Sequence, residues 1–265
     1  MERSEVMKKG KKLYEGKAKI IYATSDKNLV IQHFKDDATA FNNLKKANIE
    51  GKGVLNNRIS EHILINLGQV GIKNHLVKRI NMREQLVKVV EIIPIEFVVR
   101  NIAAGSLTKR LGIEEGTVLE YPLIEYCLKN DDLGDPLVSR EHILSLDWMN
   151  VMELELINEQ CKRINDFLLG FFRGVGIKLV DFKIEFGRSA KDNSIILADE
   201  ISPDTCRLWD SSTEKKLDKD IFRKDLGNLI EGYQEVARRL NILHEQSNIR
   251  PIKFPKPKAV KIKKK

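Results

Sequence analysis

Apolar and polar residues alternate most strictly over residues 179–187. Successive side chains of a strand point to opposite sides, so this alternation predicts a strand with one buried face. The apolar positions assigned to that face are Val180, Phe182, Ile184 and Phe186. The opposite face carries Asp181, Lys183 and Glu185, which is either an ordinary solvated surface or a row of functional groups.

A second apolar run, Ile195–Ala198, follows a turn-forming segment and ends in Asp199 and Glu200. A hairpin that turns about Asp192 would place Asp199 directly opposite Glu185. Like charges directly opposite each other destabilise a strand pair, so this register predicts a divalent cation between the two carboxylates. A turn shifted by one residue would instead put the two carboxylates on opposite faces of the hairpin.

The first third of the chain predicts several strands and one helix. The expected strands cover residues 11–15, 17–22, 29–34, 76–80 and 85–90. Apolar residues at helical spacing between 54 and 67 predict an amphipathic helix. The turn Gly16–Lys19 places Lys17 and Lys19 between paired strands, which suits phosphate binding but is also common in solvated hairpins.

A further strand is predicted over residues 92–101, with Glu96 and Arg100 on its polar face. Ser106 is the expected N-cap of a short helix over 107–111. The N-terminus of that helix and the Arg100 guanidinium would together form a phosphate site. The alternative is an ion pair between Arg100 and Glu96 beside a purely structural cap, and these residues alone leave the two readings equally balanced.

The second half of the chain predicts two longer helices. Helical spacing of apolar residues predicts the first over about 150–173, with its apolar stripe in the core. An irregular polar loop is expected over 201–210, after the hairpin. The residues of the last helix that are expected to face inward are Leu226, Leu229, Tyr233, Val236 and Leu240.

The formal charge of +8 belongs to the C-terminal segment. Residues 250–265 contain eight Lys and Arg and no acid, so the remaining 38 basic residues balance 38 acidic ones. The body shows neither a basic face nor an aromatic-rich strand motif, so specific nucleic-acid binding is not expected. The proline-interrupted tail predicts a mobile basic extension with weak attraction to polyanions.

The 265 residues suffice for one or two domains with a substantial core. No apolar run reaches the length of a membrane span, and the N-terminus lacks the apolar region of a signal peptide. The cysteines, Cys127, Cys161 and Cys206, show neither paired nor zinc-like spacing. These features predict a protein of the reducing cytoplasm that has no membrane partner.

Two long segments resemble the signatures of the SAICAR synthetase family, the phosphoribosylaminoimidazole-succinocarboxamide synthases. They are residues 92–100, continuing through 104–106, and residues 179–187. Shorter segments similar to this family occur in the same order at 16–19, 129–131, 199–204 and 207–210. The resemblance covers about residues 13–243. The chain departs from the family in its tail and at Asn42, where some relatives carry an acid, so no acidic role is expected there.

The resemblance implies a mixed α/β, ATP-grasp-like fold of two lobes, with the nucleotide in the cleft between them. The implied units are a β-rich ATP-binding lobe with one helix over 1–91, an α/β lobe with the metal and ribonucleotide sites over 92–247, and the basic tail over 248–265. The implied reaction joins carboxyaminoimidazole ribonucleotide (CAIR) to L-aspartate, with ATP cleaved to ADP and phosphate through an acyl phosphate. ATP and Mg²⁺ are the implied cofactors, and a homo-oligomer, a dimer, is expected.

The same resemblance implies roles for the residues that match the family motifs. Lys183 would steady the reacting carboxylate, and Asp181 would orient it. The ATP phosphates would be held by Lys17, Lys19 and Lys129, and Mg²⁺ by Glu185 and Asp199. Adenine would meet the main chain near Lys88 and Val90. The ribonucleotide would be bound by Arg100, Gly105, Ser106, Asp204 and Arg207.

A kinase-like phosphotransferase is the main rival interpretation. It would share the β-rich lobe, the lysines and the acidic hairpin, but it requires a catalytic base for a hydroxyl acceptor. The sequence contains no His-Arg-Asp loop that would supply one. The interpretation as a nucleic-acid-binding module depends on the tail alone.

Overall fold

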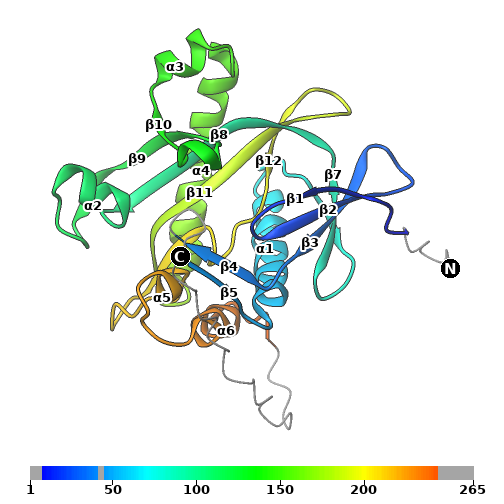
Figure 1. The fold of residues 1–265 in the computed structure, drawn as a ribbon. Coiled ribbons are helices and arrows are strands. Elements are labelled where there is room, and N and C mark those ends of the chain that lie inside the picture. The colour runs from blue at the N-terminus through cyan, green and yellow to red at the C-terminus, as the bar shows by residue number, and fades with distance from the viewer. Residues whose placement is uncertain (1–7, 41–44, 244–265) are drawn as a thin grey trace, which may run out of the picture.

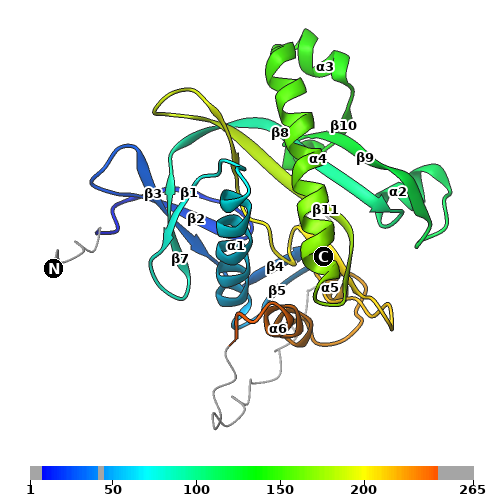
Figure 2. The same ribbon diagram turned by 180° about the vertical axis from the view of Figure 1, so that it is seen from behind.

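The computed structural model describes residues 8–40 and 45–243. The basic tail over 250–265 and Asn42 lie outside the described residues, as does the boundary expected at 247. Two main sheets form the framework of the described chain, and helices pack against them (Figures 1 and 2).

The first sheet has five antiparallel strands in the order β1-β2-β3-β7-β6. Their bounds are β1 Lys12–Glu15, β2 Lys19–Ala23, β3 Leu29–Phe34, β6 Leu76–Arg79 and β7 Glu84–Lys88. These strands confirm the expectation for the first third of the chain. A separate ribbon of β4 (Asp37–Ala40) and β5 (Lys45–Asn48) was not predicted, because its short segments lack a run of apolar residues.

The second sheet has the order β10-β9-β8-β11-β12, and β13 also pairs with β11. All of its pairs are antiparallel. Its strands are β8 Val90–Ile102, β9 Val118–Leu128, β10 Leu137–Val138, β11 Ile177–Ser189, β12 Ile195–Ala198 and β13 Cys206–Asp210. The predicted strand over 179–187 is confirmed as the centre of β11, whereas half of the loop expected over 201–210 is the strand β13.

Two long helices cover the sheets. The helix α1 (Lys52–Gln69) packs on strands of the first sheet, and α4 (Val151–Arg173) packs on β8, β9 and β11 (Figure 2). Asn150 caps α4 in a capping box with Glu153, which explains why the predicted start was accurate. The shorter helices are α2 Ser106–Leu111, η1 Asp131–Leu133, α3 Arg140–Ser145, α5 Asp220–Arg223 and α6 Leu229–Arg239.

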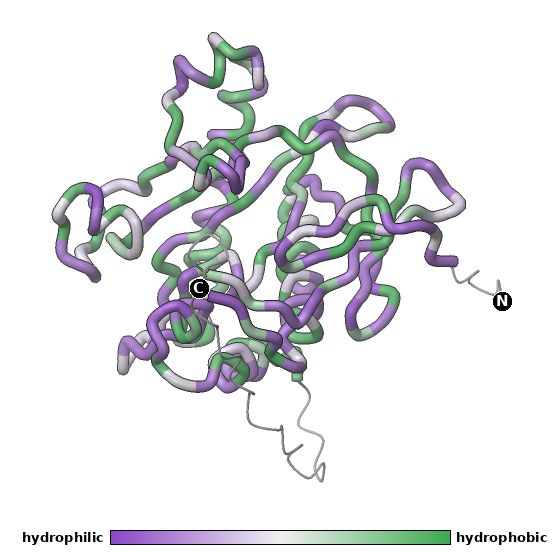
Figure 3. The backbone as a smooth tube through the Cα atoms, viewed as in Figure 1, coloured by the Kyte–Doolittle hydropathy of each residue, from purple (hydrophilic) through white to green (hydrophobic). Residues whose placement is uncertain are grey.

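One buried apolar cluster joins the two halves of the described chain. It takes side chains from α1, α4, α6, β8 and β11, and α1 packs directly on α6. Hydrophobic residues occur in each of these elements (Figure 3). Burial of this shared surface stabilises the arrangement of the two sheets, because free energy is gained roughly in proportion to the apolar area removed from water.

Three local predictions were wrong. Val180 does not share a face with Phe182, because a β-bulge near it turns Leu179 into the main core and Val180 toward Trp209. Ser106 is not the N-cap of α2 but its first residue. Leu226 precedes α6 and is exposed, because that helix begins only at residue 229.

Candidate active site

Strands β8 and β11 place polar side chains on the face opposite to the core. Their register pairs Glu96 with Glu185 and Arg100 with Asp181. Lys183 lies between these two rows, opposite Val98. The face of β11 that sequence alternation singled out is therefore continued by the neighbouring strand. The two ends of this polar face, on β8 and β11 together, carry two different groups of charged residues.

The first group, called here the acid–lysine cluster, consists of Lys19, Lys129, Lys183, Glu96, Glu185 and Asp199. Lys183 Nζ donates to Glu96 Oε1 at 2.6 Å and to Glu185 Oε1 at 2.9 Å. Lys129 Nζ donates to the same oxygen of Glu185 at 2.7 Å. Lys19 from β2 pairs with Asp199 and lies 2.9 Å from Glu200 Oε1. Lysines from both sheets thus converge on carboxylates of the second sheet.

The predicted direct opposition of Glu185 and Asp199 is wrong. Glu185 pairs with Ala198, so the hairpin is shifted by one residue. The shift does not separate the two carboxylates, because Asp199 leaves the strand with a left-handed φ of 59°. The negative charge of Asp199 still acts on Glu185, because its repulsion opposes the net lowering of the Glu185 pKa. The two acids therefore share one cluster through a local turn of the backbone that strand register alone does not describe.

The charges of this cluster compensate one another. Burial opposes the ionised form of Lys183, but the carboxylates of Glu185, Glu96 and Asp199 outweigh it and raise the pKa of Lys183 well above its usual value. In turn, Lys183 and Lys129 outweigh burial and the repulsion by Asp199, so the pKa of Glu185 is lowered. The pKa of Asp199 is lowered as well, so Glu185 and Asp199 stay ionised and can bind a cation.

The other residues expected to contact ATP surround this cluster. Lys17 lies in the β1–β2 turn, and its Nζ donates to Asp131 Oδ1 at 2.5 Å. The main-chain N–H of Lys88 donates to the carbonyl of His75 at 2.8 Å, and Lys88 Nζ to the carbonyl of Asn74 at 3.0 Å. Val90 borders a cavity of about 500 Å³ between the start of β8 and the β11–β12 turn. Lys88 and Val90 thus lie at the junction of the two sheets, outside the acid–lysine cluster.

The second group, called here the arginine cluster, consists of Arg100, Arg207, Asp181, Ser106, Gly105, Glu125 and Asp220. Asp181 Oδ2 accepts from Arg100 Nη1 at 2.8 Å and from Arg207 Nη1 at 2.7 Å. Arg100 Nη2 also donates to the Ser106 hydroxyl at 3.0 Å. The alternative of an Arg100–Glu96 ion pair is excluded, because Arg100 pairs with Asp181 and Glu125, and Glu96 pairs with Lys183.

Asp204 is not in either cluster. Its carboxylate is buried, where it pairs with Lys52 of α1 and accepts from the Tyr233 hydroxyl of α6 at 2.5 Å. Burial opposes ionisation of Asp204, but Lys52 outweighs burial and holds its pKa below the usual range. This carboxylate links α1 to α6 in the interior.

Sequence reasoning missed three residues of the site. Glu125 accepts from Arg100 Nε at 2.7 Å, and Asp220 Oδ2 accepts from Arg207 Nε at 3.0 Å. Glu125 and Lys129 have the same side-chain direction in a strand and are separated by less polar residues, which was an available signal for Glu125. His75 is buried beside the main chain of Asp199, and burial lowers its pKa to about 4. No pattern in the sequence marks His75.

A metal ion would have few protein ligands here. Among residues 8–40 and 45–243, no group of three or more His, Cys, Asp or Glu side chains is arranged to hold one. Glu185 and Asp199 supply two carboxylates, and Mg²⁺ is commonly bound by one or two carboxylates together with substrate phosphates. The oxygen donors of the cluster therefore fit Mg²⁺ bound with a nucleotide.

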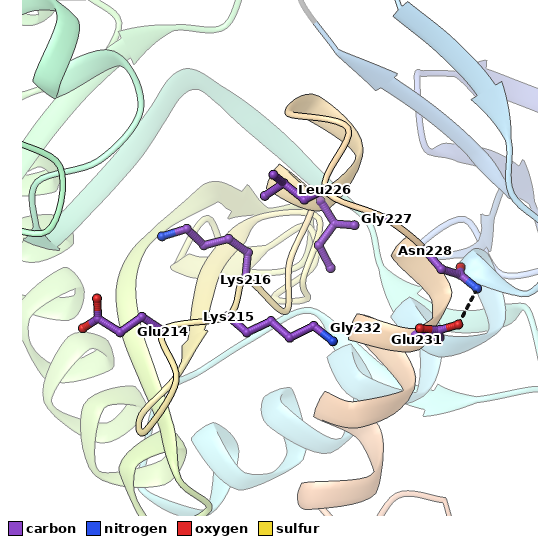
Figure 4. A pocket seen from close by; sticks show the side chains of 9 residues that line it. Glu214, Lys215, Lys216, Leu226, Gly227, Asn228, Glu231 and Gly232 are labelled. Atoms are coloured by element: carbon purple, nitrogen blue, oxygen red, sulfur yellow. Dashed lines mark hydrogen bonds between the residues drawn. The ribbon is translucent and has the colours of Figure 1, made fainter.

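A second cavity, of about 380 Å³, lies between residues 214–216 and the first turn of α6 (Figure 4). It is lined by Lys215, Lys216, Leu226, Asn228 and Glu231 among others. Figure 4 shows the side chains of Lys215 and Lys216 pointing in different directions, so they do not form a common anion site. In the described part of the chain, no helix is long and apolar enough to cross a membrane.

Comparisons with known proteins agree on one family. The profile of SAICAR synthetase matches residues 12–240. A phosphoribosylaminoimidazole-succinocarboxamide synthase of Pelagibacter ubique is 73% identical over 260 residues, which are 97% of this chain and 100% of that protein. One of Sphingopyxis alaskensis is 60% identical over 241 residues, 90% of this chain and 93% of the relative.

Solved structures of the same family resemble the fold described here. The crystal structure of the synthase from Ehrlichia chaffeensis has a TM-score of 0.87 and 56% identity, and the match covers 88% of this chain and 99% of that one. A SAICAR synthetase in complex with ADP has a TM-score of 0.83 and 45% identity, and the match covers 86% of this chain and 96% of that one. These neighbours and the mixed α/β sheets confirm the predicted ATP-grasp-like fold class.

Proposed function

The chain belongs to the SAICAR synthetase family, and we propose that its acid–lysine and arginine clusters are the two ends of one active site. The protein is an ATP-dependent carbon–nitrogen ligase of purine biosynthesis, which joins CAIR to L-aspartate and forms SAICAR, ADP and phosphate. The placement of the active site rests on β11. This strand carries Asp181 in the arginine cluster and Glu185 in the acid–lysine cluster, with Lys183 between them.

The acid–lysine cluster is the proposed end for ATP. Lys17, Lys19 and Lys129 now donate to carboxylates, and phosphate oxygens would replace these acceptors when the nucleotide binds. Glu185 and Asp199 would hold Mg²⁺, which supplies charge neutralisation at the transferred phosphoryl group. Adenine would lie near Lys88 and Val90, at the junction of the sheets.

The arginine cluster is the proposed end for the ribonucleotide phosphate. Guanidinium groups match phosphate oxygens in pairs, and Arg100 and Arg207 are held side by side by Asp181. Ser106 would add a hydroxyl, and Gly105 leaves space for Arg207. Asp181 and Glu185 are four positions apart on the strand, about 13 Å, which leaves room for the rest of CAIR between the two ends.

The proposed chemistry uses the space between the clusters. A carboxylate is a poor electrophile, so the γ-phosphoryl group of ATP is first transferred to the carboxylate of CAIR. The amine of L-aspartate then attacks this acyl phosphate and releases phosphate. Lys183 steadies the carboxylate during transfer, and Asp181 acts through the arginines that it orients.

Asp204 has a different proposed role. Because its carboxylate is paired with Lys52 and Tyr233 in the interior, we propose that it stabilises the packing of α1 on α6 and does not contact the ribonucleotide. The proposed lobes are residues 1–91 and 92–247, and the chain passes from the first sheet to the second at Val89, close to this boundary. Residues 248–265 are the proposed basic tail.

A homodimer and a cytoplasmic location are further proposals. Strand β9 pairs with β10 only near its C-terminal end, and Val118 and Tyr121 at its other end are exposed. Such an edge is available to a second copy of the chain. Cys127, Cys161 and Cys206 are free thiols, which suits a reducing compartment.

Formation of the amide product tests the assigned function. Purified protein with Mg²⁺-ATP should form SAICAR only when CAIR and L-aspartate are both present. ADP release alone is a weaker observation, because an acyl phosphate can hydrolyse without aspartate. Equal turnover with L-glutamate, or no amide with the full set of substrates, would contradict the assignment.

A further inference from the structure

Glu96 and Glu185 occupy directly opposed positions on β8 and β11. Opposed like charges destabilise a strand pair unless a cation lies between them. The ammonium of Lys183 is that cation, because its Nζ lies 2.6 Å from Glu96 Oε1 and 2.9 Å from Glu185 Oε1. One lysine thus bridges carboxylates of two neighbouring strands.

The two carboxylates differ in their other contacts. Glu185 Oε1 also accepts from Lys129 Nζ at 2.7 Å, and Asp199 repels its charge. For Glu96, Lys183 is the only hydrogen-bond partner of the carboxylate within residues 8–40 and 45–243. The main chain of Glu96 is fixed on both sides, since β8 pairs with β9 and with β11 at this residue.

Binding of Mg²⁺ at Glu185 would change the balance around Lys183. The oxygens of Glu185 would then face the metal, and the ammonium of Lys183 would be repelled by a divalent charge nearby. Glu96 lies on the other strand and would keep its carboxylate for Lys183. Without Glu96, nothing on β8 would hold the ammonium in its place.

We propose that Glu96 is a positioning residue, which holds the Lys183 ammonium beside the reacting carboxylate of CAIR once Glu185 has become a ligand of Mg²⁺. This inference rests on the proposed function, because it takes Glu185 as the metal ligand and Lys183 as the group that steadies the carboxylate. Glu96 itself touches neither substrate nor metal. Its effect on the reaction passes entirely through Lys183.

Two substitutions test this role in the full-length enzyme. Glu96→Gln keeps an oxygen acceptor but loses the charge, so kcat should fall about tenfold. Glu96→Ala removes the acceptor, and kcat should fall by about 100-fold. KM for ATP and the half-saturating Mg²⁺ concentration should change less than about threefold, since binding is not the affected step. An unchanged kcat in both variants would overturn the proposal.

A matched control and a second background make the test specific. Glu120→Ala removes an exposed carboxylate from the neighbouring strand β9 and should leave kcat unchanged. In a Lys183→Ala background, adding Glu96→Ala should change the remaining activity less than about threefold, because both residues act as one unit. If the kcat of the double variant fell by the product of the two single-variant factors, Glu96 would act independently of Lys183, and the proposal would be overturned.

A crystal structure of the wild-type protein with Mg²⁺ and ADP provides a measurement independent of activity. Lys183 Nζ should remain within hydrogen-bond distance of Glu96 while Glu185 contacts the metal. A metal bound by Glu96, or a tenfold rise in the half-saturating Mg²⁺ concentration in Glu96→Gln, would overturn the proposal. Failure of the proposed function is a different result, namely no amide product from the wild-type protein.

Discussion

The backbone of Gly105 lies directly against the guanidinium of Arg207. A Cβ atom built on Gly105 would be 2.6 Å from Arg207 Cζ, and Gly105 has φ 61° and ψ −124°. Only glycine adopts this backbone conformation readily. The residue before α2 therefore allows Arg207 to lie next to Asp181, at the proposed phosphate end of the site.

Gly105→Ala should weaken binding of the ribonucleotide. The added methyl group would displace Arg207, so KM for CAIR should rise about tenfold or more, and the free energy of unfolding should fall by about 1–3 kcal/mol because of backbone strain. Gly112→Ala is the control, since Gly112 also has a positive φ of 65° but no atom within 4 Å of its Cβ position. Equal increases in KM for the two variants, measured by steady-state kinetics, would rule out the contact with Arg207 as the cause.

Glu185→Gln should abolish most activity and also reduce stability. If no cation lay between Glu185 and Asp199, loss of one charge would relieve their repulsion and stabilise the protein. In this structure Lys183 and Lys129 lie beside Glu185 and hold its pKa below the usual value, so its charge is stabilising. Removal of that charge should therefore cost about 1–3 kcal/mol of unfolding free energy. Asp199→Asn should behave in the same way, and the double variant should lose little further activity.

Product formation at several Mg²⁺ concentrations, together with urea unfolding, checks this prediction. The half-saturating Mg²⁺ concentration should rise in both single variants, because an amide oxygen binds Mg²⁺ less well than a carboxylate. A folded Glu185→Gln protein with normal activity would end the assignment of the metal site.

Residues 179–187 show how far the sequence alone leads. Their alternation predicts the strand and the row Asp181, Lys183 and Glu185, because side-chain direction in a strand follows from its period of two. It does not predict the bulge near Val180, since a bulge depends on how the partner strand β13 pairs. A local pattern therefore identifies the face but not every side chain on it.

Contacts over long sequence distances were beyond prediction from the residues. Lys19 and Asp199 are 180 positions apart in the sequence, and their side chains are brought together only by the packing of the two sheets. The shifted hairpin register alone would put Asp199 and Glu185 on opposite faces, but the left-handed φ of Asp199 turns its carboxylate back toward Glu185. An Asp can adopt this φ without any signal in the neighbouring residues. Asp204 was grouped with the ribonucleotide site because of its segment, although its side chain points into the interior.

Asp204→Asn separates a structural role from a role in substrate contact. The change would leave Lys52 buried and without its counter-charge, which should cost about 3–5 kcal/mol of unfolding free energy. Tyr233→Phe removes one hydrogen bond to the same carboxylate and should cost less, about 1–2 kcal/mol. KM for CAIR should stay near the wild-type value in the fraction that folds. A large rise in KM with unchanged stability would instead place Asp204 on the substrate.

His75 should make the stability of the protein depend on pH. Burial lowers its pKa from 6.5 to about 4, so between these values the unfolded chain binds a proton at this residue that the folded protein does not. Stability is therefore highest above pH 6.5 and falls as the pH decreases toward 4. Between pH 7 and pH 5 this one group should account for a loss of about 2 kcal/mol.

The variant His75→Gln isolates this contribution, because glutamine stays neutral across the same range. Unfolding by urea at pH 7, 6 and 5 gives the free energy for both proteins, and the carboxylates common to them cancel in the difference. The advantage of the wild-type protein over the variant should shrink by about 2 kcal/mol from pH 7 to pH 5. A constant difference over this range would mean that the imidazole becomes protonated as easily in the folded protein as in the unfolded chain, which would contradict the lowering of its pKa by burial and by the Lys19 charge.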